Sequence, residues 1–437
     1  MAKLWGGRFK KETDKDFFNF NKSIYYDYKL VKYDLYHSLI HIGALESKGI
    51  LDDREYKKLY KVLKEILKEV KKEKFKPDFT VEDIHTDIQK RVEKKLPKIS
   101  SKLHTFRSRN EQIAFDEECF CFEESQLILN LLSQFKRSLI FLKEKYKSLP
   151  FVGYTHLQRA QVISFSNYID GFVEMFSQDI ERFKNFSSNL RVYIGCGAIS
   201  GTLLKKEDYK KSLKGFLRIN PHLGKKIKFS SCIDKISSRD FVIEFLSILS
   251  ILQMHLSRLS EDFIIFSTQE FLFFDLPEEF CTGSSLLAHK KNPDFLELVR
   301  GYTSMIYGNL ISLLTLFKGL PLTYNKDMQL DKISLFSSVE IIKEELKIMI
   351  KFIKKIRINK EKVRKSLEDD SLYAPLLVEI LVNKGVPFKE AHTMVGKLIR
   401  YIFEKKIKLR ELPASILNKL IPPLSKTEVK RIIRRPS

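Results

Sequence analysis

The sequence from Phe241 to Phe266 reads F-V-I-E-F-L-S-I-L-S-I-L-Q-M-H-L-S-R-L-S-E-D-F-I-I-F. Its apolar residues recur at helical spacing and cover more than one face, which is typical of a helix surrounded by other helices. Five long segments share this periodicity: 111–147, 164–190, 239–268, 295–318 and 339–358. At 1.5 Å per residue, such helices are roughly 30 to 55 Å long. They predict a bundle that buries surface against copies of itself.

The composition agrees with a helical fold. The 437 residues include only 17 glycines and 13 prolines, fewer than a fold of many strands and tight turns usually needs. Hydrophobic residues make up 43% and charged residues 30%, which is the balance of a globular chain rather than of a disordered or membrane protein. We therefore predict an all-α protein and disfavour an all-β one.

Shorter helical patterns flank the long segments. Leu59 to Val70 has apolar residues at spacings of three and four, as in a surface helix, and Thr80 followed by Asp83 resembles a helix start. After Asn359 the periodicity shortens, and Gly385-Val386-Pro387 separates two helices. These patterns predict three domains: an N-terminal helical domain (1–110), a central long-helix bundle (111–358) and a small C-terminal helical domain (359–437).

The net charge of +23 raises nucleic acid and acidic partners as candidates. The basic residues are spread along the chain among glutamates, and the densest stretch, Lys426 to Arg435, lacks the interleaved aromatic residues of a base-stacking surface. Lysine is therefore interpreted as the favoured surface residue, and no nucleic-acid partner is expected.

Three features bear on the cellular compartment. The N-terminus is charged and lacks the apolar core of a signal peptide, and no run of about 18 or more uncharged apolar residues exists. The five cysteines are odd in number and have no framework spacing, which favours free buried thiols in a reducing compartment. These features predict a soluble cytoplasmic protein without a membrane span.

Four polar segments interrupt the long helical patterns, and each is rich in groups that bind carboxylates or transfer protons. They are H-T-F-R-S-R-N-E-Q (104–112), G-Y-T-H-L-Q-R-A-Q (153–161), G-S-S-L-L-A-H-K-K-N-P-D (283–294) and Y-N-K-D-M-Q (324–329). Loops held by a rigid scaffold are where binding and catalytic residues usually lie. Any one segment alone is read as an ordinary polar connection, but four beside one bundle point to a functional site.

Longer motifs extend this pattern from about Lys3 to His392, in the order L-W-G-G-R-F, E-D-I-H-T, S-R-N-E-Q, G-Y-T-H-L-Q-R-A-Q, G-C-G-A-I-S-G-T, G-S-S-x-x-x-x-K-K-N-P-D, K-G-L-P-L-T-Y-N-K-D-M-Q and K-G-V-P-F-K-E-A-H. Together they resemble the argininosuccinate lyase family of the fumarase/aspartase superfamily. The serine motif alone would indicate only the superfamily, whereas the opening, histidine and Y-N-K-D-M-Q motifs are more specific to the argininosuccinate branch.

The resemblance implies a fold and a reaction. The fold is fumarase/aspartase-like, with the central bundle forming the core of a homotetramer whose sites combine loops from different subunits. The reaction is the reversible β-elimination of L-argininosuccinate to fumarate and L-arginine in arginine biosynthesis, with no cofactor and no metal. The substrate is thus a small molecule, and no membrane partner is expected.

The resemblance also assigns catalytic roles. Ser284 matches the base, and its hydroxyl needs activation by its surroundings. Lys290 matches the cation for the carboxylate and for the anionic intermediate. His156 matches the acid that assists departure of the guanidino nitrogen, and Glu297 matches the carboxylate that orients it.

The substrate-binding positions are assigned in the same way. Asn292 donates hydrogen bonds to the same carboxylate as Lys290, and Arg109 supplies a further cation suited to bidentate carboxylate binding. The fumarate-side positions are His85, Asn110 and Thr155. The positions that hold the argininosuccinate are Ser23, Tyr324, Gln329 and Lys332.

The sequence departs from the family pattern in several places. Phe106 stands where glycine is usual, Glu111 where aspartate is usual, and Leu287-Ala288-His289 where the serine loop usually carries M-P-Q. If the backbone at 106 requires a positive φ, phenylalanine is strained there and its ring crowds the carboxylate clamp. Every residue assigned a chemical role is nevertheless present.

Three alternatives stay open beside the lyase. One is another superfamily lyase acting on adenylosuccinate or aspartate, and a second is a catalytically impaired structural or binding relative, supported by the departures at 106 and in the serine loop. The third, nucleic-acid binding, rests on the net charge alone. His37 and His41 are one helical turn apart, but no third metal ligand stands out near them, so a plain helix face is preferred.

Overall fold

The computed structural model describes residues 10–434. The L-W-G-G-R-F motif at 4–9 and Arg435 therefore lie outside the described residues. The chain is 69% helical, which confirms the all-α prediction. By its contacts it divides into two compact units: unit 1 comprises Met1–Leu131, Asp179–Gln253 and Tyr302–Glu344, and unit 2 comprises Leu132–Gln178, Met254–Gly301 and Glu345–Ser437. The predicted domain boundaries at 110 and 358 stay a prediction.

Five long helices correspond to the five periodic segments. They are α6 (Arg109–Lys145), α7 (Phe165–Asn189), α11 (Asp240–Ser267), α12 (Asp294–Phe317) and α13 (Asp331–Lys355). Each has one end in unit 1 and the other in unit 2. Four of them match the predicted ends within two residues, whereas α13 begins eight residues before the predicted Val339.

Unit 1 holds the shorter N-terminal helices and one small parallel sheet. Its shorter elements are α1 (Lys15–Asn21), α2 (Ile24–Asp27), η1 (Tyr28–Leu30), α3 (Val31–Ser47), α4 (Asp53–Lys71), α5 (Ile84–Lys95), η2 (Ser100–Lys102), β3 (Val192–Ile194), α8 (Lys206–Ile219), α9 (Pro221–Gly224), β4 (Ile227–Phe229), α10 (Asp234–Ser237) and η4 (Lys326–Leu330). The buried face of α4 matches the predicted surface helix, with Leu59, Leu63 and Ile66 nearly inaccessible.

The predicted helix start at Thr80 is wrong by three residues. Helix α5 begins after Asp83, whose Oδ1 accepts a hydrogen bond from the Thr86 backbone N–H at 2.8 Å. Asp83 therefore caps the helix, because its side chain satisfies a backbone donor that has no partner within the first turn. Thr80 instead donates to Asp78 in the preceding turn.

Unit 2 holds two antiparallel strand pairs and the C-terminal helices. Its shorter elements are β1 (Pro150–Thr155), β2 (Gln158–Ser164), β5 (Phe274–Asp275), η3 (Glu278–Phe280), β6 (Arg357–Ile358), α14 (Lys360–Ser366), η5 (Asp370–Tyr373), α15 (Ala374–Asn383), α16 (Phe388–Lys405), η6 (Leu409–Glu411), α17 (Ala414–Leu420) and α18 (Lys426–Arg434). The break between α15 and α16 falls at Gly385, whose φ is +89°. That value favours glycine, so the predicted separation of two helices is confirmed.

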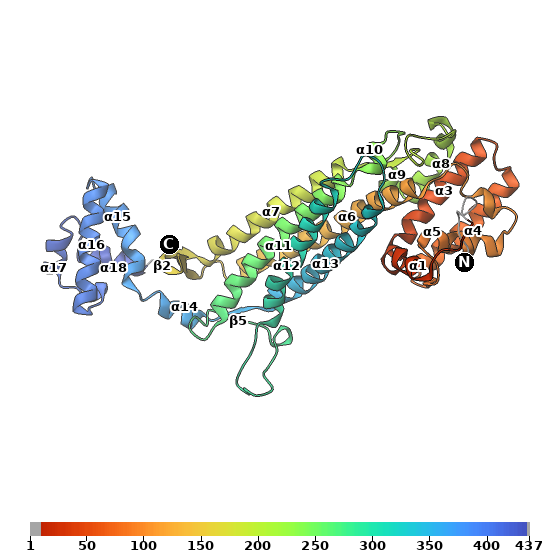
Figure 1. Ribbon diagram of the computed structural model, residues 1–437. Coiled ribbons are helices and arrows are strands. Elements are labelled where there is room, and N and C mark those ends of the chain that lie inside the picture. The colour runs from red at the N-terminus through yellow and green to blue at the C-terminus, as the bar shows by residue number, and fades with distance from the viewer. Residues whose placement is uncertain (1–9, 435–437) are drawn as a thin grey trace. The chain divides into compact units, whose positions relative to one another are not determined.

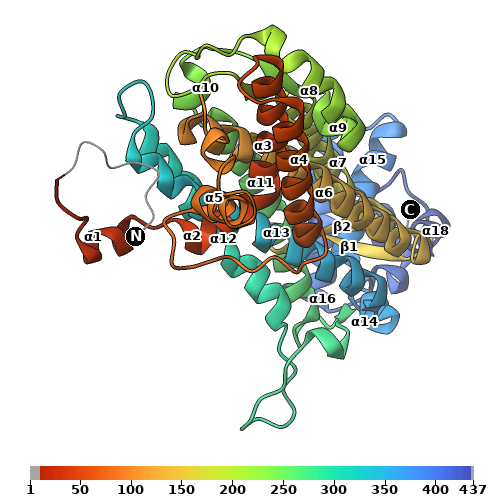
Figure 2. The same cartoon turned by 90° about the vertical axis from the view of Figure 1, so that its right-hand side faces the viewer.

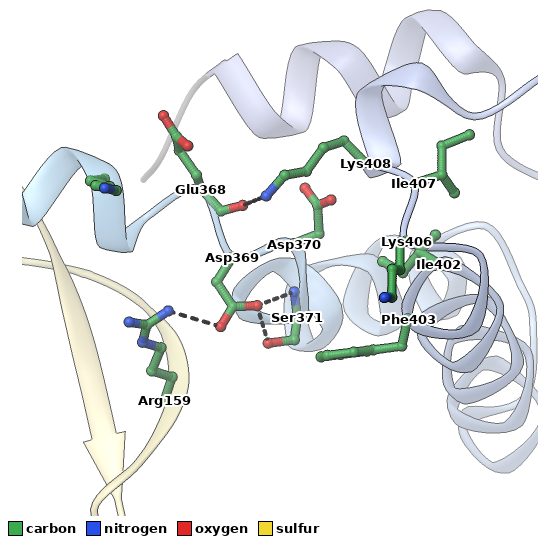
Figure 3. Close-up of a pocket in the computed structure, with 11 residues that line it drawn as sticks. Arg159, Glu368, Asp369, Asp370, Ser371, Ile402, Phe403, Lys406, Ile407 and Lys408 are labelled. Atoms are coloured by element: carbon green, nitrogen blue, oxygen red, sulfur yellow. Dashed lines mark hydrogen bonds and ion pairs between the residues drawn. The ribbon is translucent and has the colours of Figure 1, made fainter.

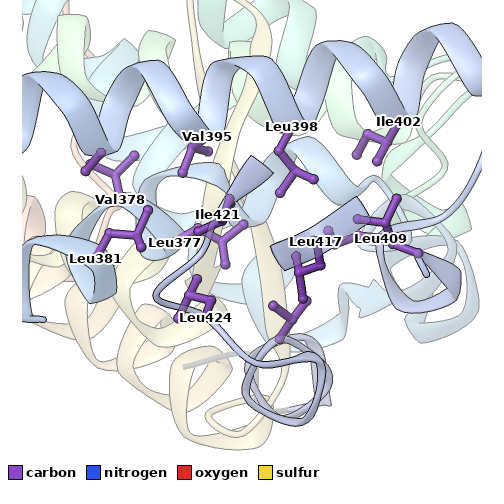
Figure 4. Close-up of a cluster of buried hydrophobic side chains, with 13 residues drawn as sticks. Leu377, Val378, Leu381, Val395, Leu398, Ile402, Leu409, Leu417, Ile421 and Leu424 are labelled. Atoms are coloured by element: carbon purple, nitrogen blue, oxygen red, sulfur yellow. The ribbon is translucent and has the colours of Figure 1, made fainter. Parts of the chain in front are cut away.

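The last four helices, α15 to α18, form a group with its own core (Figure 1). Figure 4 shows side chains of that core converging from α15, α16 and α17 and from the segments that join them. Leu377, Leu381 and Leu398 are fully buried there. Burying one such side chain contributes roughly 1.5 to 3 kcal/mol. The C-terminal helices thus have an apolar core within unit 2.

The apolar stretch from Phe241 to Phe266 lies in helix α11. It is long and apolar enough to cross a membrane by length and composition, although the sequence was expected to offer no such segment. Its side chains at Phe245, Leu252 and Leu259 have no exposed surface. A buried core helix passes the same test as a membrane span, and these residues are packed inside the protein.

Candidate active site

Ser23 lies in unit 1 beside the N-terminal end of α5. Its Oγ donates to Asp27 Oδ2 at 2.6 Å, and its backbone N–H donates to the Glu82 carbonyl at 2.9 Å. The other oxygen of Asp27 accepts from the Ile84 backbone N–H at 3.2 Å. Burial raises the pKa of Asp27 to about 6, the nearby Asp83 adds to this, and the Ser23 hydroxyl opposes it. The contacts hold Ser23 against the cap of α5.

Arg109 begins α6 and reaches the same helix end. It forms ion pairs with Glu82 at 3.3 Å and with Asp83 at 3.2 Å, and it donates to Thr86 Oγ1 at 2.9 Å. The next residue, Asn110, donates from Nδ2 to the Ala198 carbonyl at 3.1 Å. The guanidinium therefore has acidic partners in this structure, and a substrate carboxylate would have to compete with them.

His85 follows on the first turn of α5 and is 2% exposed. Its Nδ1 lies 3.1 Å from Asp34 Oδ1, and the Gln112 amide donates to the same oxygen at 2.6 Å. Ser23, His85 and Arg109, three of the predicted binding residues, are thus brought together around one helix terminus.

Lys332 belongs to a buried group of four charged side chains. Its Nζ lies 2.6 Å from Asp331 and 2.9 Å from Glu117, and the Arg239 Nε lies 2.6 Å from Glu117 and 3.1 Å from Asp331. All four are at most 1% exposed. Burial lowers the pKa of Lys332, but the two carboxylates outweigh it and hold the ammonium charged. This ion-paired environment was not anticipated for a substrate-binding lysine.

Tyr324 and Gln329, the other two binding residues predicted in this part of unit 1, have different surroundings. Gln329 donates from Nε2 to the Asn21 carbonyl at 3.2 Å. Burial raises the pKa of Tyr324, and Lys332 partly offsets that effect. Since that electrostatic influence requires proximity, Tyr324 lies near the charged group around Lys332.

The unit 2 residues lie on exposed turns. His156 and Leu157 form the two-residue turn between β1 and β2, where Thr155 pairs with Gln158. Their φ angles are +54° and +57°, the values of a type I′ hairpin turn, which glycine or asparagine usually occupies. Both side chains are exposed. The sequence predicts a polar connection at His156 and does not reveal the hairpin.

A cavity of about 740 Å³ lies along this hairpin and reaches α7 and α11. Thr155 and His156 line one part of it, and Tyr168 and Asp262 line another. Tyr168 donates to Asp262 Oδ2 at 3.2 Å. Burial raises the pKa of Asp262.

Ser284 lies on a loop that stands out from unit 2 in both Figures 1 and 2. Thr282 and Asn292 close its base through two backbone hydrogen bonds of 3.2 and 2.8 Å. The Ser284 Oγ accepts from the backbone N–H groups of Leu286 at 3.3 Å and Leu287 at 2.9 Å. Leu286 is 87% exposed. This turn orients the Ser284 hydroxyl at an accessible place.

The remaining predicted residues of this loop region are also exposed or half-buried. Lys290 is exposed, and Asn292 Nδ2 donates weakly to the Gly283 carbonyl at 3.4 Å. Glu297 lies on the first turn of α12, and its nearest ion-pair partner is Arg300 at 3.9 Å. Among residues 10–434, no hydrogen bond or ion pair joins His156 to Ser284 or to Glu297. The role of Glu297 in orienting His156 therefore stays a prediction.

The histidine hairpin is anchored to the C-terminal part of unit 2. Arg159 on β2 forms an ion pair with Asp369 at 3.2 Å, and Asp369 also accepts from the Ser371 hydroxyl at 2.6 Å (Figure 3). A cavity of about 450 Å³ lies beside this contact, and Lys408 closes part of it by donating to the Glu368 carbonyl at 2.8 Å. The contact holds β2, and with it the turn that carries His156.

The two departures in the 104–112 segment have visible consequences. Phe106 has a φ of +59°, so the predicted backbone requirement is confirmed, and an L-residue there is strained. Glu111 is buried and accepts from the backbone N–H groups of Gly195, at 3.0 Å, and of Gly197. Gly195 and Gly197 have φ of +107° and +60°. The longer carboxylate therefore orders the glycine turn that follows β3.

Two arrangements of metal-binding residue types lie in unit 1. His37 and His41 do not share a site, because His37 Nε2 lies 3.1 Å from Glu111 and His41 Nε2 lies 2.9 Å from the Thr105 carbonyl. Asp34, His85 and Asp116 form a second group, with one potential ligand atom from each within 4.8 Å of the others. All three are buried. Asp34 and Asp116 belong to no motif, so the sequence gives no sign of this group.

The fold and these motifs identify a class of enzyme. A family model described as lyase matches residues 7–308. EDDS lyase in complex with formate has a TM-score of 0.79 at 20% identity, covering 93% of this chain and 80% of that one. A class II fumarase from Schistosoma mansoni has a TM-score of 0.78 at 16% identity, covering 93% and 90%. The protein is therefore a lyase with the fumarase-type fold.

The sequence relatives narrow this class. A model described as argininosuccinate lyase C-terminal matches residues 373–435. Argininosuccinate lyase of Bacillus licheniformis is 42% identical over 94% of this chain and 88% of its own, and that of Caldanaerobacter subterraneus is 40% identical over 99% and 98%. The chain belongs to the argininosuccinate lyase family, whose members act on carbon–nitrogen bonds.

Proposed function

We propose that this protein converts L-argininosuccinate to fumarate and L-arginine by reversible β-elimination, in the cytoplasm and as part of arginine biosynthesis. The observation that carries the proposal is the clustering of Ser23, His85 and Arg109 around the N-terminal end of α5. These are hydrogen-bonding and cationic groups, which suit a dicarboxylate. The 42% identity to a curated argininosuccinate lyase supports the same substrate.

The proton-transfer steps would use the exposed and half-buried residues of the turns and loops of unit 2. Ser284 removes the proton beside a carboxylate, and Lys290 with Asn292 stabilises the doubly charged carboxylate form that results. His156 then protonates the departing guanidino nitrogen, with Glu297 holding its imidazole. The two backbone N–H groups that point at the Ser284 oxygen favour its alkoxide form, because each donates to the oxygen that must bear negative charge.

The exposed positions of these residues suit a site completed by further copies of the chain. Helix α12 presents Leu298, Met305, Ile311 and Leu314, which are 45 to 60% exposed. Exposed apolar residues along one long helix are typical of a surface that packs against another protein. We propose a homotetramer in which the α12 helices pack against other subunits, and in which loops of different subunits share each site.

The experiment that tests the proposal is fumarate release by the purified protein, measured with L-argininosuccinate, adenylosuccinate and L-aspartate as substrates. Release from argininosuccinate alone supports the proposal. Release only from one of the other two substrates would replace it with another superfamily lyase.

A catalytically impaired relative is the second candidate, and the strain at Phe106 favours it. Phe106 lies three residues before Arg109, so a displaced backbone there would shift the carboxylate clamp. A folded tetramer that binds L-argininosuccinate in calorimetry and releases no fumarate from any of the three substrates would support this candidate.

A further inference from the structure

Asp34, on α3, is the feature of unit 1 that the proposed mechanism leaves unused. It is 1% exposed, and its Oδ1 lies 3.1 Å from Nδ1 of His85, which is 2% exposed. The amide of Gln112, on α6, donates to the same oxygen at 2.6 Å. A carboxylate that accepts from an amide and faces an imidazole fixes which ring nitrogen carries a proton.

The charge state of this pair follows from its surroundings. Burial lowers the pKa of His85, but the Asp34 carboxylate outweighs burial, and the pKa lies above its ordinary value. Burial raises the pKa of Asp34, yet His85 brings it below its ordinary value. Both directions describe the same state, an imidazolium next to a carboxylate, since a buried charge is tolerated when it is paired.

The other titratable groups that face this pair come from three helices or their caps and from the loop before α6. They are Asp27 at the end of α2, Asp83 at the cap of α5, Asp116 on α6, and His104 and Arg107 in the loop. Burial and the neighbouring Arg107 bring the pKa of His104 to about 2, so His104 is neutral. The two aspartates Asp27 and Asp83 favour a charged His85, whereas Arg107 favours an ionised Asp34.

Asp116 differs from Asp34 although the two are neighbours. Both of its carboxyl oxygens are buried and have no hydrogen-bond partner among residues 10–434. Burial raises the pKa of Asp116 well above its ordinary value, and the Asp34 charge adds to this. Two carboxylates this close cannot both ionise cheaply, so Asp116 is the one that keeps its proton.

We propose that Asp34 is a positioning residue that holds His85 as an imidazolium beside a protonated Asp116, so that the fumarate end of the substrate meets a fixed positive charge. This inference rests on the proposed function, in which His85 binds that end. Asp34 acts through His85, because it is 1% exposed and, among residues 10–434, His85 is the predicted substrate-binding residue that its carboxylate contacts.

The first test is the titration of His85 by NMR in the full chain, with its signal assigned by its loss in a His85→Gln variant. In the wild type, we expect His85 to titrate above about 6.5. The Asp34→Asn variant should move that midpoint below 6.5. The matched variant Asp116→Asn should leave it in place, because asparagine resembles a protonated aspartate in shape and charge. A wild-type midpoint at or below 6.5 would overturn the proposal even if neither variant folds.

The second test is the pH dependence of KM for L-argininosuccinate. Asp34→Asn should raise KM about tenfold at about pH 8, and by less at about pH 6, where the imidazole becomes protonated without help. The turnover number should change much less, and Asp116→Asn should follow the wild type. Equal effects of the two variants, or a rise in KM that does not depend on pH, would show that Asp34 has only a structural role.

The two proposals fail separately. If the wild type releases no fumarate, the proposed function fails while the NMR titration still decides the charge of His85. If the wild type is active and His85 titrates as a neutral imidazole at pH 7, only the Asp34 inference fails.

Discussion

The predicted site residues of unit 1 and those of unit 2 differ in how firmly burial and polar contacts fix their side chains. Lys332 and His85 are at most 2% exposed and bonded to buried carboxylates, whereas His156 is exposed on a turn and Ser284 is half-buried on a projecting loop. Groups that bind charge need fixed partners, because rebuilding them for each substrate costs free energy. Groups that transfer protons must approach and leave the substrate, so mobile loops suit them.

The largest effect should come from the loop residues of unit 2. Ser284→Ala should lower kcat about 10³-fold or more, because the proposed base is gone, while thermal unfolding stays nearly unchanged. The measurement is steady-state fumarate release together with a melting curve. Ser285→Ala, at the exposed neighbouring position, is the control and should keep its rate. Equal rates for the two variants would mean that another group is the base.

The buried set should respond in stability instead. Arg239→Met leaves Glu117 and Asp331 with one cation between them, and the free energy of unfolding should fall by about 3 kcal/mol. Arg300→Met is the matched control, because it breaks an ion pair with Glu261 of 2.7 Å in which both side chains are 44% exposed. That change should cost less than about 1 kcal/mol. Chemical denaturation measures both, and similar losses would erase the contrast between the two sets.

A smaller effect should appear in the pH dependence of stability. The pKa of Asp27 is about 6 in the folded protein and close to 4 in the unfolded chain, so the folded state holds the proton more tightly. The free energy of unfolding should therefore fall by about 2 kcal/mol as the pH rises from about 4 to about 6. Asp27→Asn removes this term and should flatten the profile over that range. An unchanged slope would show that Asp27 is ionised in the fold throughout.

The smallest effect concerns Phe106, the departure from the family pattern whose backbone is strained by a positive φ. Phe106→Gly should raise the free energy of unfolding by about 0.5 kcal/mol, since relief of the positive φ exceeds the entropy that glycine adds to the unfolded chain. Phe106→Ala removes the ring but keeps the strain, so it should give no gain. A loss of stability in the glycine variant would mean that ring contacts outweigh the backbone strain.

The helical scaffold could be predicted closely because periodicity is a local property. The ends of α6, α7, α11 and α12 follow the apolar pattern within two residues. Helix α13 begins earlier than predicted because its first turn buries Asp331 and Lys332 as an ion pair instead of apolar side chains. The β1–β2 hairpin was missed because His156 and Leu157 occupy turn positions that normally signal themselves by glycine or asparagine.

The sequence predicts which residues belong to the site, but it does not predict which residues they contact. The family resemblance selects Ser23, Arg109 and Lys332, but it does not report which carboxylates surround them. Asp34 and Glu117 belong to no motif, and they lie 51 and 215 positions from His85 and Lys332 respectively, so only the folded chain reveals them. Burial and long-range charge pairing are therefore what the sequence alone leaves undetermined.

The interleaving of the two units has a consequence during synthesis. Unit 1 needs its last segment, Tyr302–Glu344, before Lys332 can neutralise Glu117. At about 5 to 20 residues per second, roughly 15 to 60 s pass on the ribosome between the emergence of α3 and that of this segment. During this time Glu117 lacks the Lys332 ammonium, and Phe120 on α6 lacks the Phe336 ring that it meets at 4.9 Å. The nascent chain should therefore be a client of chaperones that hold helical apolar surfaces until translation ends.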